Sequence, residues 1–195
     1  MAVSPAPAPT PDLSVVVPVL DEEETLEELY RQIAAALGSG GEWELLLVDD
    51  GSTDRTPVIS RALARADRRV RPVRLARRYG QSTAMQAGFD HARGDIIVTL
   101  DGDLQNDPAD IPALVEELNR GFDLVVGYRV RRQDRFLTRK VPSWVANRII
   151  RWMTRVPVRD NGCSLKAYRR ELIDALRLYS DVHRFIPALA VGVAG

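Results

Sequence analysis

The sequence contains a single cysteine, Cys163, so an internal disulfide framework is excluded and a reducing compartment is favoured. Its formal net charge is zero, so no overall positive field favours nucleic acid as a partner. No uninterrupted apolar run reaches the roughly 20 residues that a transmembrane helix needs. The basic start and long apolar centre of a signal peptide are also missing, so we expect no secretion.

Two common phosphate-binding signatures are absent as well. No Gly-x-Gly-x-x-Gly follows the first apolar run, and no Gly-x-x-x-x-Gly-Lys occurs anywhere, which excludes a dinucleotide fingerprint and a phosphate loop. A nucleotide ligand would therefore be held by metal and carboxylates. We interpret Cys163 as a buried small residue rather than a nucleophile, because no histidine lies near it in sequence.

The length of 195 residues and the hydrophobic content of 45% predict one domain with a substantial core. Residues 1–11 alternate alanine and proline, so we expect a disordered tail before a folded domain over residues 12–195. Residues 185–195 form an apolar segment without a closing signal, so we expect the natural chain to continue beyond Gly195.

Apolar runs alternate with helical periodicity along the first two thirds of the chain. Strands are predicted over residues 13–19, 43–48, 70–75, 96–100 and 122–126. Helices are predicted to begin near residues 21, 54, 81 and 108, with acidic residues 22–24 suiting the dipole of the first and Ser52 or Asp54 capping the second. This alternation predicts an α/β fold with a mostly parallel sheet and helices on both faces.

Several charged residues follow the predicted strands directly. Ligands of parallel sheets bind at the carboxyl ends of strands, so these side chains should meet on one rim. Gly80, at a predicted helix start, should offer free amide hydrogens to an anion at the same rim. Carboxylates that hold a metal, beside arginines and helix amides, suit a nucleotide diphosphate. The residues expected on this rim are Glu22, Asp50, Arg77, Asp101, Asp103 and Arg129.

The apolar run over residues 96–100 ends in Asp101-Gly102-Asp103. Side chains alternate along an extended segment, so both carboxylates can project on the same side, and Gly102 lets the backbone bend closely around an ion. Hard oxygen ligands of this kind suit Mg²⁺ or Mn²⁺. Turn chemistry explains the tripeptide equally well in isolation, but the acids and arginines on the same rim favour a metal site.

Residues 142–156 predict a basic amphipathic helix, with apolar side chains on one face and Arg148, Arg151 and Arg155 on another. Helices of this kind that carry tryptophan often lie in a membrane interface. Periodicity alone leaves open the alternative that the helix packs on the sheet as an ordinary surface helix.

Taken together, the motifs resemble glycosyltransferase family 2 enzymes with a GT-A fold, and within them the polyprenyl-phosphate glycosyltransferases similar to dolichol-phosphate mannose synthase. The resemblance extends from about Leu13 to the last residue. The matching segments are Val17-Pro18-Val19-Leu20-Asp21-Glu22, Val48-Asp49-Asp50-Gly51-Ser52-Thr53-Asp54, Arg78-Tyr79-Gly80-Gln81, Asp101-Gly102-Asp103-Leu104-Gln105 and Gly127-Tyr128-Arg129.

This resemblance implies a role for each matched position. The nucleotide-sugar site would comprise Pro18, Leu20, Glu22, Asp50, Gly80, Gln81, Asp101 and Gly102. The metal, Mg²⁺ or Mn²⁺, and the diphosphate would be held by Asp101, Asp103 and Gln105. The acceptor phosphate would be bound by Arg129, Arg139 and Ser143. The catalytic residues would be Asp103 and Asp160, although Asp160 can equally be a residue that orients the acceptor or the sugar.

The implied reaction is an inverting, metal-dependent transfer of a sugar from a GDP- or UDP-linked donor to undecaprenyl or dolichyl phosphate. The enzyme would be cytoplasmic and peripheral at the inner face of the cell membrane, bound through the basic helix. The sugar stays open, because residues 160–170 also resemble the branch that transfers amino-arabinose. The alternatives are a nucleotidyltransferase, a family 2 enzyme with a saccharide acceptor, a phospho-acceptor signalling domain and an inactive binding module.

Overall fold

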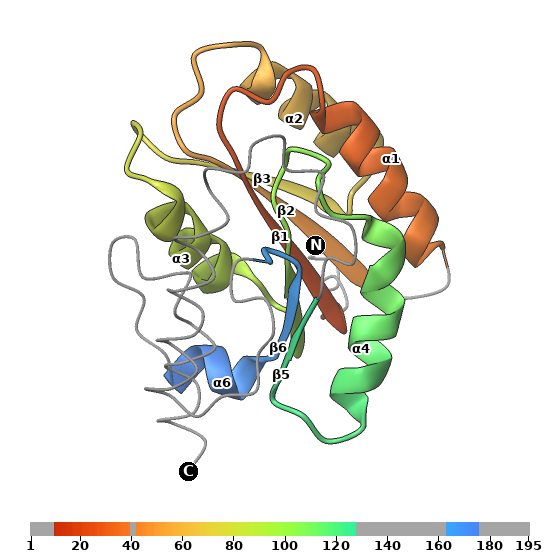
Figure 1. Cartoon of the computed structure of the whole chain (residues 1–195). Coiled ribbons are helices and arrows are strands. Elements are labelled where there is room, and N and C mark those ends of the chain that lie inside the picture. Colours follow the sequence, from red (N-terminus) through yellow and green to blue (C-terminus); the bar gives the residue numbers. More distant parts are fainter. Residues whose placement is uncertain (1–9, 40–41, 128–162, 176–195) are drawn as a thin grey trace, which may run out of the picture.

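The computed structural model describes residues 10–39, 42–127 and 163–175, which form a six-stranded sheet in the order β3-β2-β1-β4-β6-β5 (Figure 1). The central strand β1 runs parallel to β2 and β4, and β2 runs parallel to β3. The elements are β1 (Leu13–Val19), α1 (Leu26–Leu37), β2 (Trp43–Asp49), α2 (Thr56–Ala66), β3 (Val70–Arg74), α3 (Gln81–His91), β4 (Ile96–Thr99), the 3₁₀ helix η1 (Pro108–Asp110), α4 (Ile111–Asn119), β5 (Leu124–Val126), β6 (Lys166–Arg169) and α6 (Arg170–Ala175).

The sheet separates two hydrophobic cores. Helices α1, α2 and α4 cover one face, and α3 and α6 cover the other (Figure 1). Strand β1 supplies both cores, because Val15 and Val17 point to the first face and Val16 points to the second. All three side chains are fully buried, as expected for a central parallel strand covered on both sides. The predicted α/β architecture with helices on both faces is confirmed.

One strand departs from the parallel arrangement. Strand β6 lies between β4 and β5 and runs antiparallel to both. Its residue Tyr168 is buried against Phe89 of α3, with ring centroids 5.9 Å apart in an edge-to-face arrangement. This burial raises the pKa of the Tyr168 hydroxyl. The chain after Ser164 therefore enters the sheet as β6 between β4 and β5, a placement that periodicity did not predict.

The first helix begins later than predicted. Residues 21–25 form a bend and turn, and α1 starts only at Leu26. Asp21 has a positive φ of 55°, and the backbone N–H groups of Glu22 and Glu23 donate to Thr56 Oγ1 and Asp54 Oδ2. Because these amides bind the neighbouring loop, residues 22–24 do not form the acidic first turn that we predicted.

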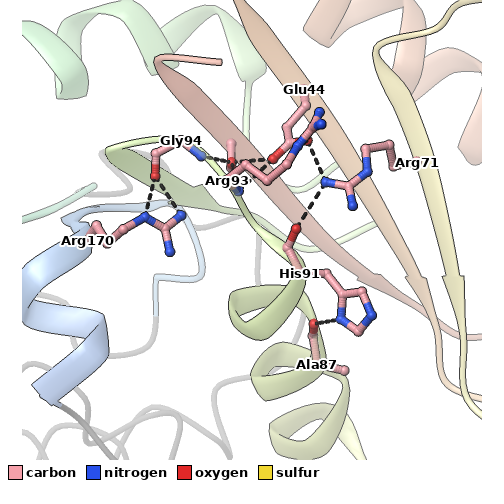
Figure 2. Close-up of polar contacts among 8 residues, drawn as sticks. Glu44, Arg71, Ala87, His91, Arg93, Gly94 and Arg170 are labelled. Atoms are coloured by element: carbon pink, nitrogen blue, oxygen red, sulfur yellow. Dashed lines mark hydrogen bonds and ion pairs between the residues drawn. The ribbon is translucent and has the colours of Figure 1, made fainter. Parts of the chain in front are cut away.

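A buried polar cluster around Glu44 joins the amino-terminal ends of β1, β2 and β3 (Figure 2). Glu44, at the start of β2, accepts from Ser14 Oγ at 2.7 Å, from Arg71 Nη1 at 2.6 Å and from the backbone N–H of Arg93 at 2.8 Å. Burial alone would raise the pKa of Glu44, but the hydrogen bonds from Arg71, Ser14 and Arg93 outweigh it and lower the pKa. The carboxylate therefore ties four chain segments together in its ionised form.

In the part of the chain that the structure describes, no helix is both long and apolar enough to cross a membrane. Several sequence predictions lie outside these residues and stay predictions: Arg129, Arg139, Ser143, Asp160, the basic helix over residues 142–156, and the chain ends 1–9 and 185–195.

Candidate active site

A cleft of about 290 Å³ opens at the carboxyl ends of β1, β2 and β4. Its residues come from the end of β1, from the loops after β1, β2 and β4, and from α3 with the loop before it. All lie on the rim predicted at the carboxyl ends of the parallel strands. Every residue predicted for the nucleotide sugar lines it, as does Asp103. The lining consists of Pro18, Val19, Leu20, Glu22, Asp50, Arg78, Gly80, Gln81, Ala84, Asp101, Gly102 and Asp103.

The adjacent carboxylates Asp49 and Asp50 are both buried, and each is held differently. Asp49 Oδ1 accepts from the backbone N–H of Ser52 at 2.7 Å, while its Oδ2 lies 3.2 Å from Arg74 Nε. The Arg74 contact is an ion pair without hydrogen-bond geometry. Asp50 points the other way, toward the loop before α3, so only Asp50 reaches the cleft.

Both oxygens of Asp50 accept backbone hydrogen bonds. Tyr79 N–H donates to Oδ1 at 2.7 Å and Gly80 N–H donates to Oδ2 at 2.9 Å. The Gly80 amide is thus occupied by the chain's own carboxylate, so the prediction that it would be free for an anion is wrong. Gly80 still lines the cleft, and its φ of 100° is one that residues with a side chain rarely adopt.

The loops after β1 and β2 are joined by reciprocal hydrogen bonds. Asp21 N–H donates to Ser52 Oγ at 3.0 Å, and Thr53 N–H donates to Asp21 Oδ1 at 2.8 Å. Asp54 Oδ1 accepts a hydrogen bond from the backbone N–H of Thr56, the first residue of α2. Of the two residues predicted to cap this helix, Asp54 and not Ser52 therefore contacts its first amide. These contacts explain why the two motifs carry so many small polar residues around Asp50.

Asp101 and Asp103 stand at the end of β4 with different surroundings. Gln81 Nε2 donates to Asp101 Oδ1 at 2.8 Å. The exposed Asp103 instead accepts a local hydrogen bond from the Gln105 backbone N–H, at 3.1 Å. Gly102 lies between them and close to Glu22. A Cβ atom built on Gly102 would lie 3.4 Å from Glu22 Cγ.

The donor set fits a divalent cation that retains other ligands. Within the described ranges, no three His, Cys, Asp or Glu side chains converge into a complete metal site. Mg²⁺ commonly takes one or two carboxylates and fills its remaining positions with water and substrate phosphate. The exposed Asp103 and the partly buried Asp101 suit that role. Gln105 is exposed and does not line the cleft, so its predicted role as a ligand stays a prediction.

Arg78 lines the cleft although it was not among the charged residues predicted for the rim. It is the one cationic side chain among the described residues that line the cleft. We had expected Arg77 there, but the Arg77 guanidinium lies 5.0 Å from the centre of the Tyr79 ring. Strand alternation offers no guide in the irregular loop before α3, so only the resemblance of the Arg78-Tyr79-Gly80-Gln81 segment pointed to Arg78.

Comparison with known proteins identifies a family over most of the chain. The family model described as glycosyl transferase family 2 matches residues 14–177. The first residue matched is Ser14 in β1, and the match extends beyond β6. It therefore includes all the segments that form the cleft.

Curated relatives are identical to this chain at about half of the aligned positions. Dodecaprenyl-phosphate galacturonate synthase from Rhizobium johnstonii is 50% identical over 190 residues, covering 96% of this chain and 56% of the relative. Undecaprenyl-phosphate 4-deoxy-4-formamido-L-arabinose transferase from Shewanella sediminis is 45% identical over 184 residues, covering 93% of this chain and 55% of the relative. The chain thus spans little more than half the length of these proteins.

A solved structure supports the same fold. Glucosyl-3-phosphoglycerate synthase from Mycobacterium tuberculosis, in complex with Mn²⁺, UDP-glucose and phosphoglyceric acid, superposes with a TM-score of 0.69 at 26% identity. The superposition covers 90% of this chain and 63% of that one. With this neighbour, the predicted GT-A fold class is confirmed.

Proposed function

Because the chain belongs to glycosyl transferase family 2, we propose that it transfers a sugar from a nucleotide sugar to a polyprenyl phosphate. The observation that carries this proposal is the cleft, which brings Glu22, Asp50, Asp101 and Asp103 together from three separate strand ends. The acceptor is inferred from the relatives, whose names specify dodecaprenyl phosphate and undecaprenyl phosphate.

The proposed donor carries a uridine or guanosine diphosphate. A uridine nucleotide is the first choice for testing, because the structural neighbour contains UDP-glucose. We propose that Pro18, Leu20, Glu22 and Asp50 surround the nucleoside at the β1 and β2 side of the cleft. The diphosphate would then lie toward Asp101 and Asp103, which are on the β4 side.

Asp101 and Asp103 are proposed to hold Mg²⁺ or Mn²⁺ together with the diphosphate. A divalent cation, when bound, would neutralise the charge that develops on the leaving diphosphate. In such a site the Asp101 side chain would already be restrained by its hydrogen bond from Gln81, whereas the Asp103 side chain is exposed to solvent before the cation binds. The neighbour's complex with Mn²⁺ supports this assignment.

Arg78 is proposed to contact the diphosphate. The cleft lining contains four carboxylates, so an anionic donor needs a compensating positive charge near them. A guanidinium can bind two phosphate oxygens at once, which fixes orientation as well as charge. Arg78 would thereby offset the repulsion between the donor and the carboxylates.

The proposed chemical step is an inverting displacement. An oxygen of the acceptor phosphate attacks the anomeric carbon, a new carbon–oxygen bond forms, and the bond to the departing nucleoside diphosphate breaks. A phosphate monoester with a second pKa of about 6 is already largely dianionic near neutral pH, so no strong general base is required. From the sequence, we propose that Arg129, Arg139 and Ser143 bind this phosphate and that Asp160 orients the acceptor or the sugar.

We further propose that the protein acts at the inner face of the cell membrane. The basic segment over residues 142–156 would rest on anionic lipid and bring the acceptor phosphate within reach of the cleft.

The experiment that tests this function is a panel of labelled donors with undecaprenyl phosphate. UDP-galacturonate, UDP-glucose, UDP-formamido-arabinose and GDP-mannose are each incubated with Mn²⁺ or Mg²⁺. We expect one donor to give labelled lipid and an equal amount of nucleoside diphosphate. Release of pyrophosphate from a nucleoside triphosphate, or transfer only to a soluble saccharide, would contradict the proposal.

A further inference from the structure

Gln81, the first residue of α3, contacts the candidate metal site directly. Its side-chain Nε2 donates to Asp101 Oδ1 at 2.8 Å, across twenty residues of sequence. Both side chains are partly buried in the wall of the cleft. A hydrogen bond of this kind restrains the orientation of a carboxylate before any ligand arrives.

The helix that carries Gln81 is fixed closely on the sheet. At Gly88 of α3, a Cβ atom would lie only 2.3 Å from Val16 Cγ1 of β1, so the helix backbone approaches the central strand as only glycine allows. Met85 and Phe89 are buried in the second core on the same helix. The body of α3 therefore gives Gln81 little freedom to move away from β4.

The beginning of α3 is fixed separately, by Asp50. The Asp50 side chain is buried and accepts from the amides of Tyr79 and Gly80, the two residues immediately before Gln81. Hydrogen bonds to an ionised carboxylate are stronger than neutral ones, particularly where water is excluded. The Asp50 carboxylate thus sets the path of the chain into the first turn of α3.

We infer that Asp50 and Gln81 are positioning residues that act in series on the metal site. Asp50 holds residues 79–80, this loop fixes Gln81, and Gln81 orients the Asp101 carboxylate toward the cation and the diphosphate. The inference rests on the proposed function, since it assumes a cation at Asp101. It gives Asp50 and Gln81 a task besides the direct contact with the nucleotide sugar that the family resemblance implies.

Removing a hydrogen-bond partner of a metal ligand commonly weakens metal affinity about 10- to 100-fold. Gln81→Leu keeps the approximate volume of the side chain but removes the donor to Asp101. We therefore expect its dissociation constant for Mn²⁺ to rise about tenfold, measured by the electron paramagnetic resonance signal of free Mn²⁺ with UDP present. The Mn²⁺ concentration for half-maximal transfer should rise in parallel, with a smaller loss of rate at saturating Mn²⁺ than at limiting Mn²⁺.

Gln86→Leu is the matched control on the same helix. Gln86 Nε2 also donates to an aspartate at 2.8 Å, namely Asp90, but this pair lies away from the cleft lining. Its loss should leave Mn²⁺ binding unchanged. Thermal unfolding of both variants checks that the fold is retained.

A double-mutant cycle with Asp50→Asn tests whether the two residues act in series, at UDP concentrations that saturate every variant so that the proposed nucleoside contact of Asp50 does not affect the result. If Asp50 acts through Gln81, the single Asp50→Asn variant binds Mn²⁺ more weakly than the wild type, and the double variant binds it no more weakly than Gln81→Leu. Full additivity of the two losses would overturn the series, and wild-type Mn²⁺ binding by Gln81→Leu would overturn the whole inference. Absence of Mn²⁺ binding by the wild-type protein would instead contradict the proposed metal site itself.

Discussion

Gly51 lies directly against the backbone of Arg77. A Cβ atom on Gly51 would sit 2.6 Å from the Arg77 carbonyl carbon, and the φ of Gly51 is +82°. Gly51 immediately follows Asp50, and Arg77 immediately precedes Arg78, so this contact brings together two loops that line the cleft. Space and backbone conformation both require glycine at this position.

Gly51→Ala should therefore displace the loop that carries Arg78. We expect it to destabilise the protein by about 3 kcal/mol, because backbone atoms have to move apart, and to weaken UDP binding. Gly121→Ala is the control: Gly121 also has a positive φ, but a Cβ atom there would meet no atom of the described residues within 4 Å outside its immediate chain neighbours. That variant should lose only about 1 kcal/mol and bind UDP normally. Equal losses in chemical denaturation would contradict the close contact.

Arg78→Gln should raise the KM for every donor about tenfold, because the diphosphate is common to all of them. Arg78→Lys should recover part of this loss, since it restores the charge but not the paired geometry of the guanidinium. The measurement is steady-state kinetics with UDP-galacturonate and UDP-glucose. A loss confined to UDP-galacturonate would assign Arg78 to the sugar carboxylate instead of the diphosphate.

Glu44→Gln should destabilise the protein by about 2 kcal/mol at pH 7. The reason is that the guanidinium groups of Arg71 and Arg93, which pair with Glu44 Oε2 at 2.6 and 2.8 Å, then lose a buried carboxylate. The pKa of Glu44 is lowered in the folded protein, so its contribution is complete above the ordinary value of 4.5 and is lost as the pH falls through the folded value. The stability difference between wild type and variant should consequently shrink as the pH falls from 7 to 3. Denaturant unfolding at several pH values measures it, and a constant difference would contradict this account.

The basic helix predicted over residues 142–156 should bind anionic membranes. Replacing Trp144 and Trp152 with Ala, and Arg148 and Arg151 with Gln, should reduce co-sedimentation with phosphatidylglycerol vesicles at least fivefold, since each lost cation near the surface is worth about 1 kcal/mol. Undiminished binding by this variant would show that the helix does not lie in the interface.

A control with the same loss of charge uses the exposed arginines of α2, Arg61 and Arg65. Their replacement with Gln should leave vesicle binding nearly unchanged. An equal decrease in both variants would mean that overall charge, and not the predicted helix, determines membrane binding.

The sequence predicted the fold closely where apolar periodicity is strong. The first strand was predicted over residues 13–19 and is found as Leu13–Val19, because apolar residues fill the segment and only Ser14 interrupts them. The antiparallel position of β6 was not predictable in this way. Pairing between β6 and β4 depends on a long-range contact, such as Ile97 opposite Tyr168, that no local pattern encodes.

The cleft was predicted in part, because strand ends are visible in sequence but hydrogen-bond partners are not. The positions of Asp50 and Asp101 follow from the strands that precede them. Their partners come from α3, where Gly80 turns its amide to Asp50 and Gln81 turns its side chain to Asp101. These contacts depend on how α3 is seated on β1, which only the folded structure reveals.

The most direct test of metal-dependent transfer at this cleft compares Asp103→Asn with Asp107→Asn. Both aspartates are exposed and lie in the same loop, but Asp107 accepts from the Ala109 backbone N–H at the start of η1 and does not line the cleft. The measurement is the rate of Mn²⁺-dependent sugar transfer to undecaprenyl phosphate with the donor that the panel identifies. The account predicts a loss of at least about a hundredfold for Asp103→Asn and a rate near that of the wild type for Asp107→Asn. Near-normal turnover by Asp103→Asn would contradict it.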